Sequence, residues 1–211
     1  MQRAIYLLSP TPREDTLSLP MITFKSTVEH IDFTTCDTLM FTSKQAVVTA
    51  NELDKNWKKY PCIAIGPATK RQIEDLGGEV IYFPKEFYGE NLSRDIAAFF
   101  KEKKLLYLRP KEVSFDSKGF LEKAGITLQE QVIYETSCIQ YTLDEKPQKD
   151  AIIIFTSPST IHCFFKNFDW DESYTAVVIG KATLVHLPPQ VNYHIADEAL
   201  ISACIEKAKQ I

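Results

Sequence analysis

The feature that most constrains the fold is a pair of short motifs that each occur twice with the same spacing. The tripeptide F-T-S at residues 41–43 recurs at 155–157, and I-G-x-A-T at residues 65–69 recurs at 179–183. Both recurrences lie 114 positions downstream, and two independent short matches seldom share one offset by chance. Because self-similarity at a fixed spacing marks a repeated structural unit, the sequence predicts two related halves.

The segments between these motifs alternate between strand and helix patterns. Ten short runs, mostly apolar and β-branched on consecutive positions, are typical of strands buried on both faces of a parallel sheet. They are residues 4–8, 21–24, 38–42, 62–65, 80–83, 105–108, 131–134, 151–156, 176–179 and 191–195. We therefore expect an α/β protein with two flavodoxin-like lobes, each a five-stranded parallel sheet with flanking helices, joined by two crossing linkers around a cleft.

The lobes need not coincide with the halves of the chain. Residues 36–137 hold a contiguous block of five strands and form the expected inner lobe. The other five strands come from both ends of the chain, so the expected terminal lobe is discontinuous and consists of residues 1–30 and 149–211. The expected linkers are about residues 27–35 and the polar run 138–150.

The terminal lobe has too little chain for one of its crossovers. A parallel crossover usually needs a dozen or more residues and often a helix, but Ser9–Pro20 carries three prolines. We therefore expect this lobe to be trimmed and to lack that helix. A looser repeat pairs Tyr-Leu at residues 6–7 with Tyr-Leu at 107–108, each in an apolar run that ends in proline.

Composition limits the class of protein. With 211 residues, of which 45% are apolar, the chain is long enough for two small cores and too apolar for disorder. The formal net charge of -4 argues against non-specific binding of nucleic acid, although a local basic pocket for small anions is compatible with it.

The cysteines and the apolar runs bear on the compartment. The five cysteines are odd in number, lack a C-x-x-C pair and mostly lie among apolar residues, which predicts reduced thiols in a cytosolic protein. The apolar stretch near Met1 is shorter than the core of a signal peptide. No run approaches the roughly 18 apolar residues of a membrane span, so we expect a cytoplasmic protein without membrane contact.

Hydroxyl side chains mark the expected binding site. In open parallel sheets, ligands bind at the carboxyl ends of strands, where helix N-termini present free N–H groups. Ser43 and Ser157 each follow a strand and open a helix, while Thr69 and Thr183 lie just inside helices that follow a glycine. Such hydroxyls suit an anion, but Ser43 and Ser157 are equally explained as helix N-caps. Their duplication in both lobes favours a shared ligand.

Basic side chains gather at the same strand ends, although each alone is more often a solvated surface charge. They are Lys44, Arg109, Lys111 and Lys181. The chain has no glycine-rich nucleotide motif, no histidine pair with metal-ligand spacing and no G-x-S-x-G elbow, so we expect neither a cofactor nor a metal. The residues alone predict an anion held between two α/β lobes, without naming a reaction.

The set of motifs resembles uroporphyrinogen-III synthases over essentially the whole chain. Members of that family carry F-T-S-x-x-A-V, two G-x-x-T turns, V-Y-x-T before the return linker and F-T-S-P-S after it. The corresponding segments here are residues 41–47, 66–69, 180–183, 133–136 and 155–159, the last ending in Ser159. The family usually has an arginine after the first strand and a helix before the second, and S-P-T-P at residues 9–12 replaces both.

The resemblance implies a lyase of haem biosynthesis that needs no cofactor. Its substrate is hydroxymethylbilane, which it dehydrates and cyclises to uroporphyrinogen III with inversion of the last pyrrole ring. The substrate carries eight carboxylates, which the resemblance assigns to the hydroxyl and basic residues above and to Ser159. Tyr134 of the V-Y-x-T motif is the candidate for assisting loss of the hydroxyl, and the alternative is a core tyrosine with its hydroxyl at the cleft edge.

Two further expectations concern partners and competing functions. A transient contact with the preceding enzyme of the pathway is expected, and contact with nucleic acid or membrane is not. The competing function is a non-catalytic two-lobe α/β protein that binds or senses an anionic small molecule. Incubation with fresh hydroxymethylbilane, followed by separation of the uroporphyrin isomers, distinguishes these functions.

Overall fold

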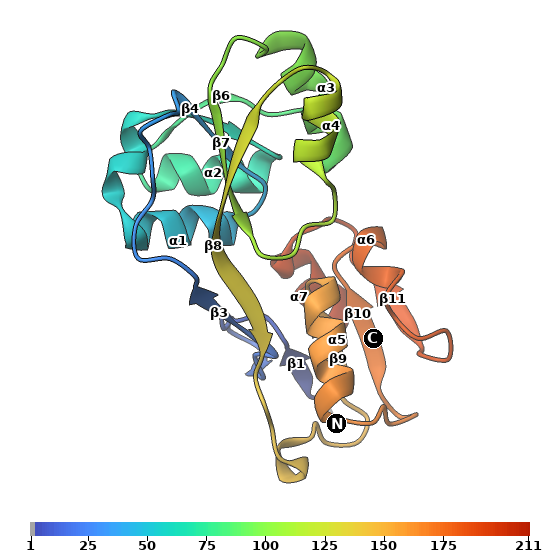
Figure 1. Ribbon diagram of the computed structural model, residues 1–211. Coiled ribbons are helices and arrows are strands. Elements are labelled where there is room, and N and C mark those ends of the chain that lie inside the picture. Colours follow the sequence, from blue (N-terminus) through green and yellow to red (C-terminus); the bar gives the residue numbers. More distant parts are fainter. Residues whose placement is uncertain (1–2) are drawn as a thin grey trace. The chain divides into compact units, whose positions relative to one another are not determined.

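The computed structural model describes residues 3–211, which form two compact units (Figure 1). The inner unit is Phe24–Glu135, and the terminal unit combines the chain up to Thr23 with Thr136–Ile211. Both boundaries fall within strands, β3 (Ile22–Ser26) and β8 (Leu128–Cys138), which carry the chain from one unit to the other.

The inner unit contains a six-stranded sheet in the order β3-β8-β7-β4-β5-β6. The strands from β8 to β6 are parallel to their neighbours. The added bounds are β4 (Thr38–Phe41), β5 (Pro61–Ala64), β6 (Glu79–Tyr82) and β7 (Leu105–Pro110). The strand expected at residues 21–24 exists as β3. It pairs with β8 as a sixth strand of this sheet, and the boundary between the two units falls within it, after Thr23.

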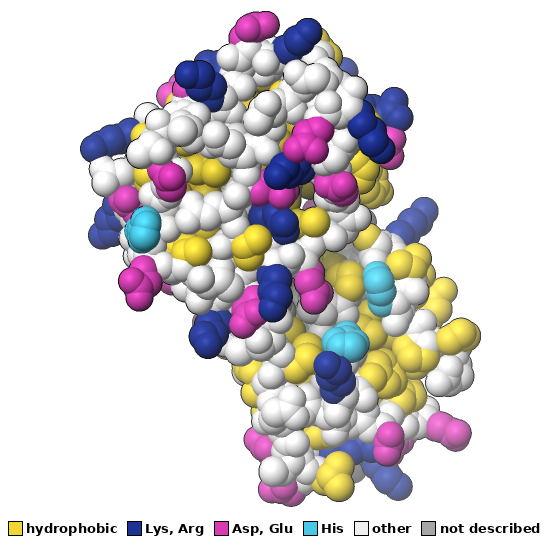
Figure 2. Space-filling view, in the orientation of Figure 1, with side chains coloured by type: hydrophobic (Ala, Val, Ile, Leu, Met, Phe, Trp, Pro, Cys, Tyr) yellow, Lys and Arg dark blue, Asp and Glu magenta, His cyan; other side chains and the backbone are white. Residues whose placement is uncertain are grey.

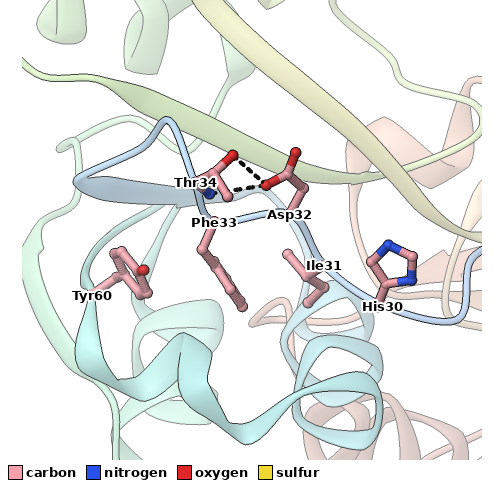
Figure 3. Close-up of a pocket in the computed structure, with 6 residues that line it drawn as sticks. All are labelled: His30, Ile31, Asp32, Phe33, Thr34 and Tyr60. Carbon is pink, nitrogen blue, oxygen red and sulfur yellow. Dashed lines mark hydrogen bonds between the residues drawn. The ribbon is translucent and has the colours of Figure 1, made fainter.

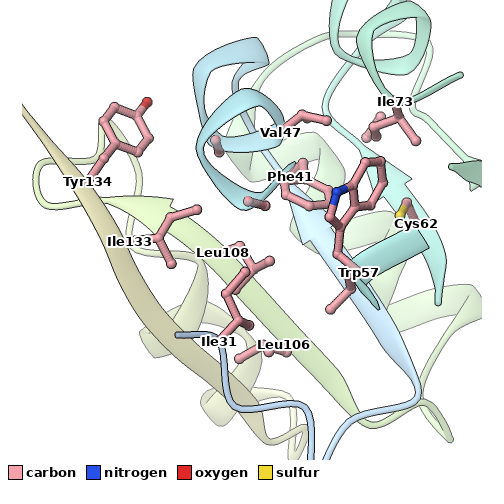
Figure 4. Packing of buried hydrophobic residues seen from close by; sticks show 14 residues of the cluster. Ile31, Phe41, Val47, Trp57, Cys62, Ile73, Leu106, Leu108, Ile133 and Tyr134 are labelled. Atoms are coloured by element: carbon pink, nitrogen blue, oxygen red, sulfur yellow. The ribbon is translucent and has the colours of Figure 1, made fainter. Parts of the chain in front are cut away.

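Helices cover both faces of this sheet because its central strands are apolar on consecutive positions. Leu39 and Phe41 of β4 pack in a cluster with residues of α1 and α2, around the buried Trp57 (Figure 4). Met40, between them, points to the other face and packs in a cluster with residues of α3 and α4. The helices are α1 (Lys44–Leu53), α2 (Pro67–Asp75), α3 (Gly89–Phe99) and α4 (Ser117–Lys123), with a 3-10 turn, η1 (Lys55–Lys59).

The terminal unit contains a five-stranded, all-parallel sheet in the order β11-β10-β9-β1-β2. Its strands are β1 (Ile5–Leu7), β2 (Leu17–Ser18), β9 (Ile152–Phe155), β10 (Thr175–Val178) and β11 (Tyr193–Ile195). Its helices are α5 (Pro158–Asn167), α6 (Lys181–Leu184), α7 (Ile201–Lys209) and the turn η2 (Leu143–Glu145). The described residues 8–16 form no helix, as the three prolines predict.

Both sheets have the same strand order when each is counted from its F-T-S strand. If β4, β5, β6, β7 and β8 are numbered 1 to 5, they lie side by side in the order 3-2-1-4-5. If β9, β10, β11, β1 and β2 are numbered 1 to 5, they lie in the same order. The looser Tyr-Leu repeat falls on β1 and β7, which are both fourth strands. The terminal unit is therefore a circularly permuted copy of the inner one. This order differs from the order 2-1-3-4-5 of flavodoxin, so the flavodoxin-like detail of the expected lobes is not confirmed. Burial patterns specify strands but not their neighbours.

A disulfide overturns the expectation that every cysteine is a free thiol. Cys138 at the end of β8 is bonded to Cys163 of α5, with 5.2 Å between their Cα atoms. Asn167 of α5 donates to Ile139 O (2.9 Å) and accepts from Tyr141 N (2.8 Å), so the return segment is tied to this helix at three points. Three free cysteines remain in the described chain, Cys36, Cys62 and Cys204.

None of the helices described between residues 3 and 211 has the length and the apolar character that crossing a membrane requires.

Loss of the disulfide should destabilise the terminal unit. The bond joins residues 25 positions apart, for which the loss of chain entropy in the unfolded state is worth about 3.5 kcal/mol. Cys138→Ser should lower the free energy of unfolding by about that amount, measured by urea titration of the oxidised protein. Cys36→Ser is the matched control and should change it little. Equal midpoints for Cys138→Ser and the oxidised wild type would contradict the assignment.

Candidate functional site

The candidate site lies at the carboxyl edge of the inner sheet. Strands 1 and 4 of the common order, β4 and β7, are neighbours whose following segments leave to opposite sides, which is where ligands bind in open parallel sheets. Ser43 follows β4, Thr69 lies in the helix after β5, Arg109 is the next-to-last residue of β7, and Tyr134 lies near the end of the inner part of β8. The adjacency of these four strands therefore brings the predicted inner residues to one edge.

Ser43 makes two contacts through one hydroxyl. It has an extended backbone and caps α1, where its Oγ accepts a hydrogen bond from Ala46 N at 3.0 Å. The same Oγ lies 2.9 Å from the hydroxyl of Tyr134. The N-cap interpretation of Ser43 is therefore confirmed, and the contact with Tyr134 is a second role that a cap alone does not need. Lys44, the first residue of α1, is exposed beside it.

A β-bulge directs Tyr134 toward Ser43. Arg109 pairs with Val132 and Pro110 pairs with Tyr134, so Ile133 is an extra residue in β8. Successive side chains of a regular strand point to opposite faces, but an extra residue allows two consecutive ones to share a face. Ile133 and Tyr134 accordingly both pack in the cluster beneath α1 (Figure 4). The Tyr134 side chain is re-aimed by backbone geometry that side-chain alternation does not predict.

Burial keeps the phenols of this edge protonated. It raises the pKa of Tyr134, which is 4% exposed, although the hydrogen bond with Ser43 acts in the opposite direction. Burial likewise raises the pKa of Tyr107 to about 12, opposed by its contact with Thr42. The Thr42 and Tyr107 hydroxyls lie 2.5 Å apart. This second pair was missed from the sequence, although the Tyr-Leu repeat at residues 107–108 was a signal for it.

Arg109 and Lys111 have acidic partners within the sheet. Arg109 Nε lies 3.2 Å from Glu130 Oε1 without hydrogen-bond alignment, while its Nη1 donates to the carbonyls of Pro110 and Lys111 at 3.0 and 3.1 Å. Lys111 Nζ lies 3.0 Å from Glu135 Oε2. Their charges are thus largely matched locally, so they are weaker candidates for an anion than the sequence suggested. Thr69 is buried in the first turn of α2.

The predicted residues of the terminal unit form a simpler version of the same edge. Ser157 Oγ accepts from Thr160 N at 3.3 Å and Thr160 Oγ1 accepts from Ser157 N at 3.2 Å, which is a reciprocal cap of α5. Ser159 is half-buried in the first turn. The fifth strand here is β2, which has only two residues and no tyrosine. Lys181 is exposed and Thr183 buried in α6, a helix of four residues.

One hollow of the inner unit lies at the opposite edge of the sheet. It has a volume of about 470 Å³ and is lined by residues 30–34 and Tyr60 (Figure 3). Phe33 stacks on Tyr60 at 4.9 Å, and hydrogen bonds from Thr34 lower the pKa of Asp32. These residues precede β4 and β5, so the hollow opens at the amino ends of the strands and contains none of the predicted site residues.

Charge is mixed on the face of the inner unit that Figure 2 shows. Figure 2 shows Lys and Arg side chains interspersed with Asp and Glu on the face in view, without a broad area of one sign. Binding of an anion on this face therefore depends on local donors, such as helix N-termini and hydroxyls, rather than on a general positive field.

The family follows from sequence comparison. A family model described as uroporphyrinogen-III synthase HemD matches residues 14–205. The chain belongs to the uroporphyrinogen-III synthase family. No curated protein sequence matches it significantly.

Solved structures of this family have the same fold. The chain is similar to uroporphyrinogen-III synthetase from Helicobacter pylori, with 28% identity, a TM-score of 0.82 and 99% of each chain covered. A mutant uroporphyrinogen III synthase from Thermus thermophilus has a TM-score of 0.60 at 11% identity, again with 99% of each chain covered, and shows the shared fold alone. The predicted resemblance is confirmed, and the chain is an enzyme of haem biosynthesis.

The raised pKa of Tyr107 predicts a loss of stability in alkali. Between pH 10 and 12 the unfolded chain releases this proton while the folded chain keeps it, so the free energy of unfolding falls as pH rises. The expected fall is at most about 2.7 kcal/mol from this residue. Urea titrations at pH 9 and pH 11 should show a smaller fall for Tyr107→Phe than for wild type or for the exposed control Tyr193→Phe. An equal fall in the free energy of unfolding of all three proteins would refute a raised pKa of Tyr107 as the cause.

Proposed function

We propose that the chain is a hydro-lyase that converts hydroxymethylbilane to uroporphyrinogen III. The observation that carries this proposal is the Tyr134 hydroxyl, held 2.9 Å from Ser43 at the N-terminus of α1 in a member of this family. The proposal adds to family membership the substrate, the product and the loss of water, and it assigns parts of the reaction to named residues.

Tyr134 acts as the proton donor to the departing hydroxyl. A phenol is neutral near pH 7, and burial raises the pKa of Tyr134 further, so this side chain is present as a donor and not as a base. The carbon–oxygen bond of the hydroxymethyl group breaks, and the phenol proton joins the departing hydroxide to form water. The substrate is then an azafulvene cation, and Tyr134 is a phenolate. Ser43, already accepting from Ala46 N, donates its own proton in a hydrogen bond to the phenolate oxygen. The proton released when the last ring closes restores the phenol.

The substrate carboxylates bind at the helix N-termini. The first turns of α1, α2 and α5 offer backbone N–H groups beside Ser43, Thr69 and Ser157, and Ser159 adds a hydroxyl. The exposed Lys44 and Lys181 supply positive charge, while Arg109, Lys111 and Thr183 have lesser roles because of their partners or burial. The transient contact with the preceding enzyme and the cytoplasmic location also belong to this proposal.

The deciding experiment is the isomer assay. Purified protein is mixed with freshly made hydroxymethylbilane, the products are oxidised, and the uroporphyrin isomers are separated. Isomer III in excess of the protein supports the proposal, because the uncatalysed closure gives isomer I. Isomer I alone, at the rate seen without protein, rejects it and favours the non-catalytic binding protein.

Removal of the Tyr134 hydroxyl should slow turnover more than it weakens binding. Tyr134→Phe should lower kcat about 100-fold, near the bottom of the range for general acid catalysis, because the leaving group also ionises unaided. KM should change less. Tyr82→Phe is the matched control. Tyr82 lies on the outer strand β6, and the substitution deletes a hydroxyl that donates a hydrogen bond to Asp95 of α3. An unchanged kcat in a cooperatively folded Tyr134→Phe protein assigns Tyr134 a packing role only.

The two serine caps allow a paired test of carboxylate binding. Ser43→Ala and Ser157→Ala should each weaken binding of uroporphyrinogen III by at most about 1.5–3 kcal/mol, because the backbone donors remain. Ser43→Pro and Ser157→Pro should weaken it more, because each deletes an N–H and distorts the turn. Lys44→Glu should do so in a salt-dependent way. Anaerobic calorimetric titration measures these effects, and unchanged affinity in both folded proline variants would place the site elsewhere.

A further inference from the structure

The loop that precedes α3 crosses the carboxyl edge of the inner sheet. A Cβ atom added at Gly66, in the turn after β5, would lie 2.9 Å from Cγ of Phe87. A Cβ atom added at Gly89 would lie 2.8 Å from Cβ of Phe115, in the segment after β7. The segment from Phe87 to Gly89 thus runs between the segments that follow β5 and β7, the two neighbours of β4, and Ser43 follows β4.

Two aromatic side chains on this segment face solvent. Phe87 is 52% exposed and Tyr88 is 65% exposed. The backbone of Gly66 is extended, so glycine is required there for space and not for a left-handed conformation, and the space is filled by the Phe87 ring. Phe87 is therefore fixed on one side and open on the other. Tyr88 has an extended backbone before α3, and its side chain makes no capping hydrogen bond.

Adjacent exposed aromatic rings on a fixed backbone are typical of a binding surface. The ligand chemistry that fits them is a flat, electron-rich ring, which packs on tyrosine and phenylalanine in offset or edge-to-face geometry. Lys70, one turn into α2 after Gly66, carries a positive charge, and its Nζ lies 3.7 Å from Glu74 Oε1. A pyrrole ring that carries carboxylates matches both properties.

We propose that Phe87 and Tyr88 form an aromatic rim that binds one pyrrole ring of the substrate beside Ser43 and Tyr134. This inference rests on the proposed function. The rim fixes the orientation of that ring while the reactive cation exists, and orientation decides whether the inverted or the direct closure is faster. The rim is thus a determinant of isomer specificity and takes no part in proton transfer.

Substitutions at the rim can be matched to a control on the same helix. Tyr88→Ala removes an exposed ring, Phe87→Leu removes a ring but keeps an apolar side chain against Gly66, and Tyr88→Phe keeps the ring without its hydroxyl. Phe99→Ala is the control, because Phe99 is 70% exposed at the other end of α3. The measurements are KM, kcat, the ratio of isomer I to isomer III, and the urea midpoint.

The expected result is a change in binding and isomer ratio without a change in stability. Tyr88→Ala should raise KM about tenfold, the effect of losing one aromatic contact and its buried area, and should increase the fraction of isomer I. Phe87→Leu should act in the same direction, and Tyr88→Phe should change KM and the isomer ratio less than Tyr88→Ala does. Phe99→Ala should match wild type. A wild-type KM and isomer ratio in both folded Tyr88→Ala and Phe87→Leu would overturn the rim while leaving the proposed function intact. Isomer I alone from the wild type would reject the proposed function and the rim with it.

Discussion

The direction of the Tyr134 side chain depends on the extra residue that β8 accommodates at Ile133. With regular pairing, Ile133 and Tyr134 would point to opposite faces of the sheet, and the phenol would lie away from α1. The bulge places both on the α1 side, where the phenol meets the Ser43 hydroxyl that already caps the helix. The candidate site thus joins a strand irregularity to a helix cap, two features that each fix backbone as well as side chain.

Duplication of the sheet did not produce two equal sites. Both units keep the order 3-2-1-4-5 and a serine that caps the helix after the F-T-S strand. The terminal unit lacks a counterpart of the long strand β8 with its tyrosine and of helix α2, because β2 has two residues and α6 has four. Ser157 therefore shares its hydroxyl with Thr160 N alone, whereas Ser43 also meets a tyrosine. The proposed function accordingly places proton donation in the inner unit and gives the terminal unit backbone donors for carboxylates.

Local features of the fold could be predicted from the sequence, and pairings between distant segments could not. Apolar runs revealed ten strands, the motif repeat revealed the duplication, and three prolines revealed the missing helix after β1. The partner of β3, the strand order and the Cys138–Cys163 bond depend on which segments lie side by side. The same holds for Arg109 and Lys111, whose acidic partners on β8 are invisible in a list of basic residues near strand ends. The hydroxyl of Ser43 was predictable because a cap and a ligand contact require the same position.

The chemistry explains why such a site relies on neutral groups. The leaving hydroxyl of the substrate ionises readily, so a strong acid would accelerate a step that is already easy. It would also generate the cation before the linear tetrapyrrole has reached the conformation that closes correctly. A buried phenol with a raised pKa donates a proton only to a group placed against it, which couples departure to correct positioning. The exposed rings of Phe87, which packs against Gly66, and of Tyr88 would supply that positioning. In this arrangement geometry directs the reaction. The direct closure proceeds without an enzyme, so the inverted closure prevails only if orientation of the substrate makes it faster.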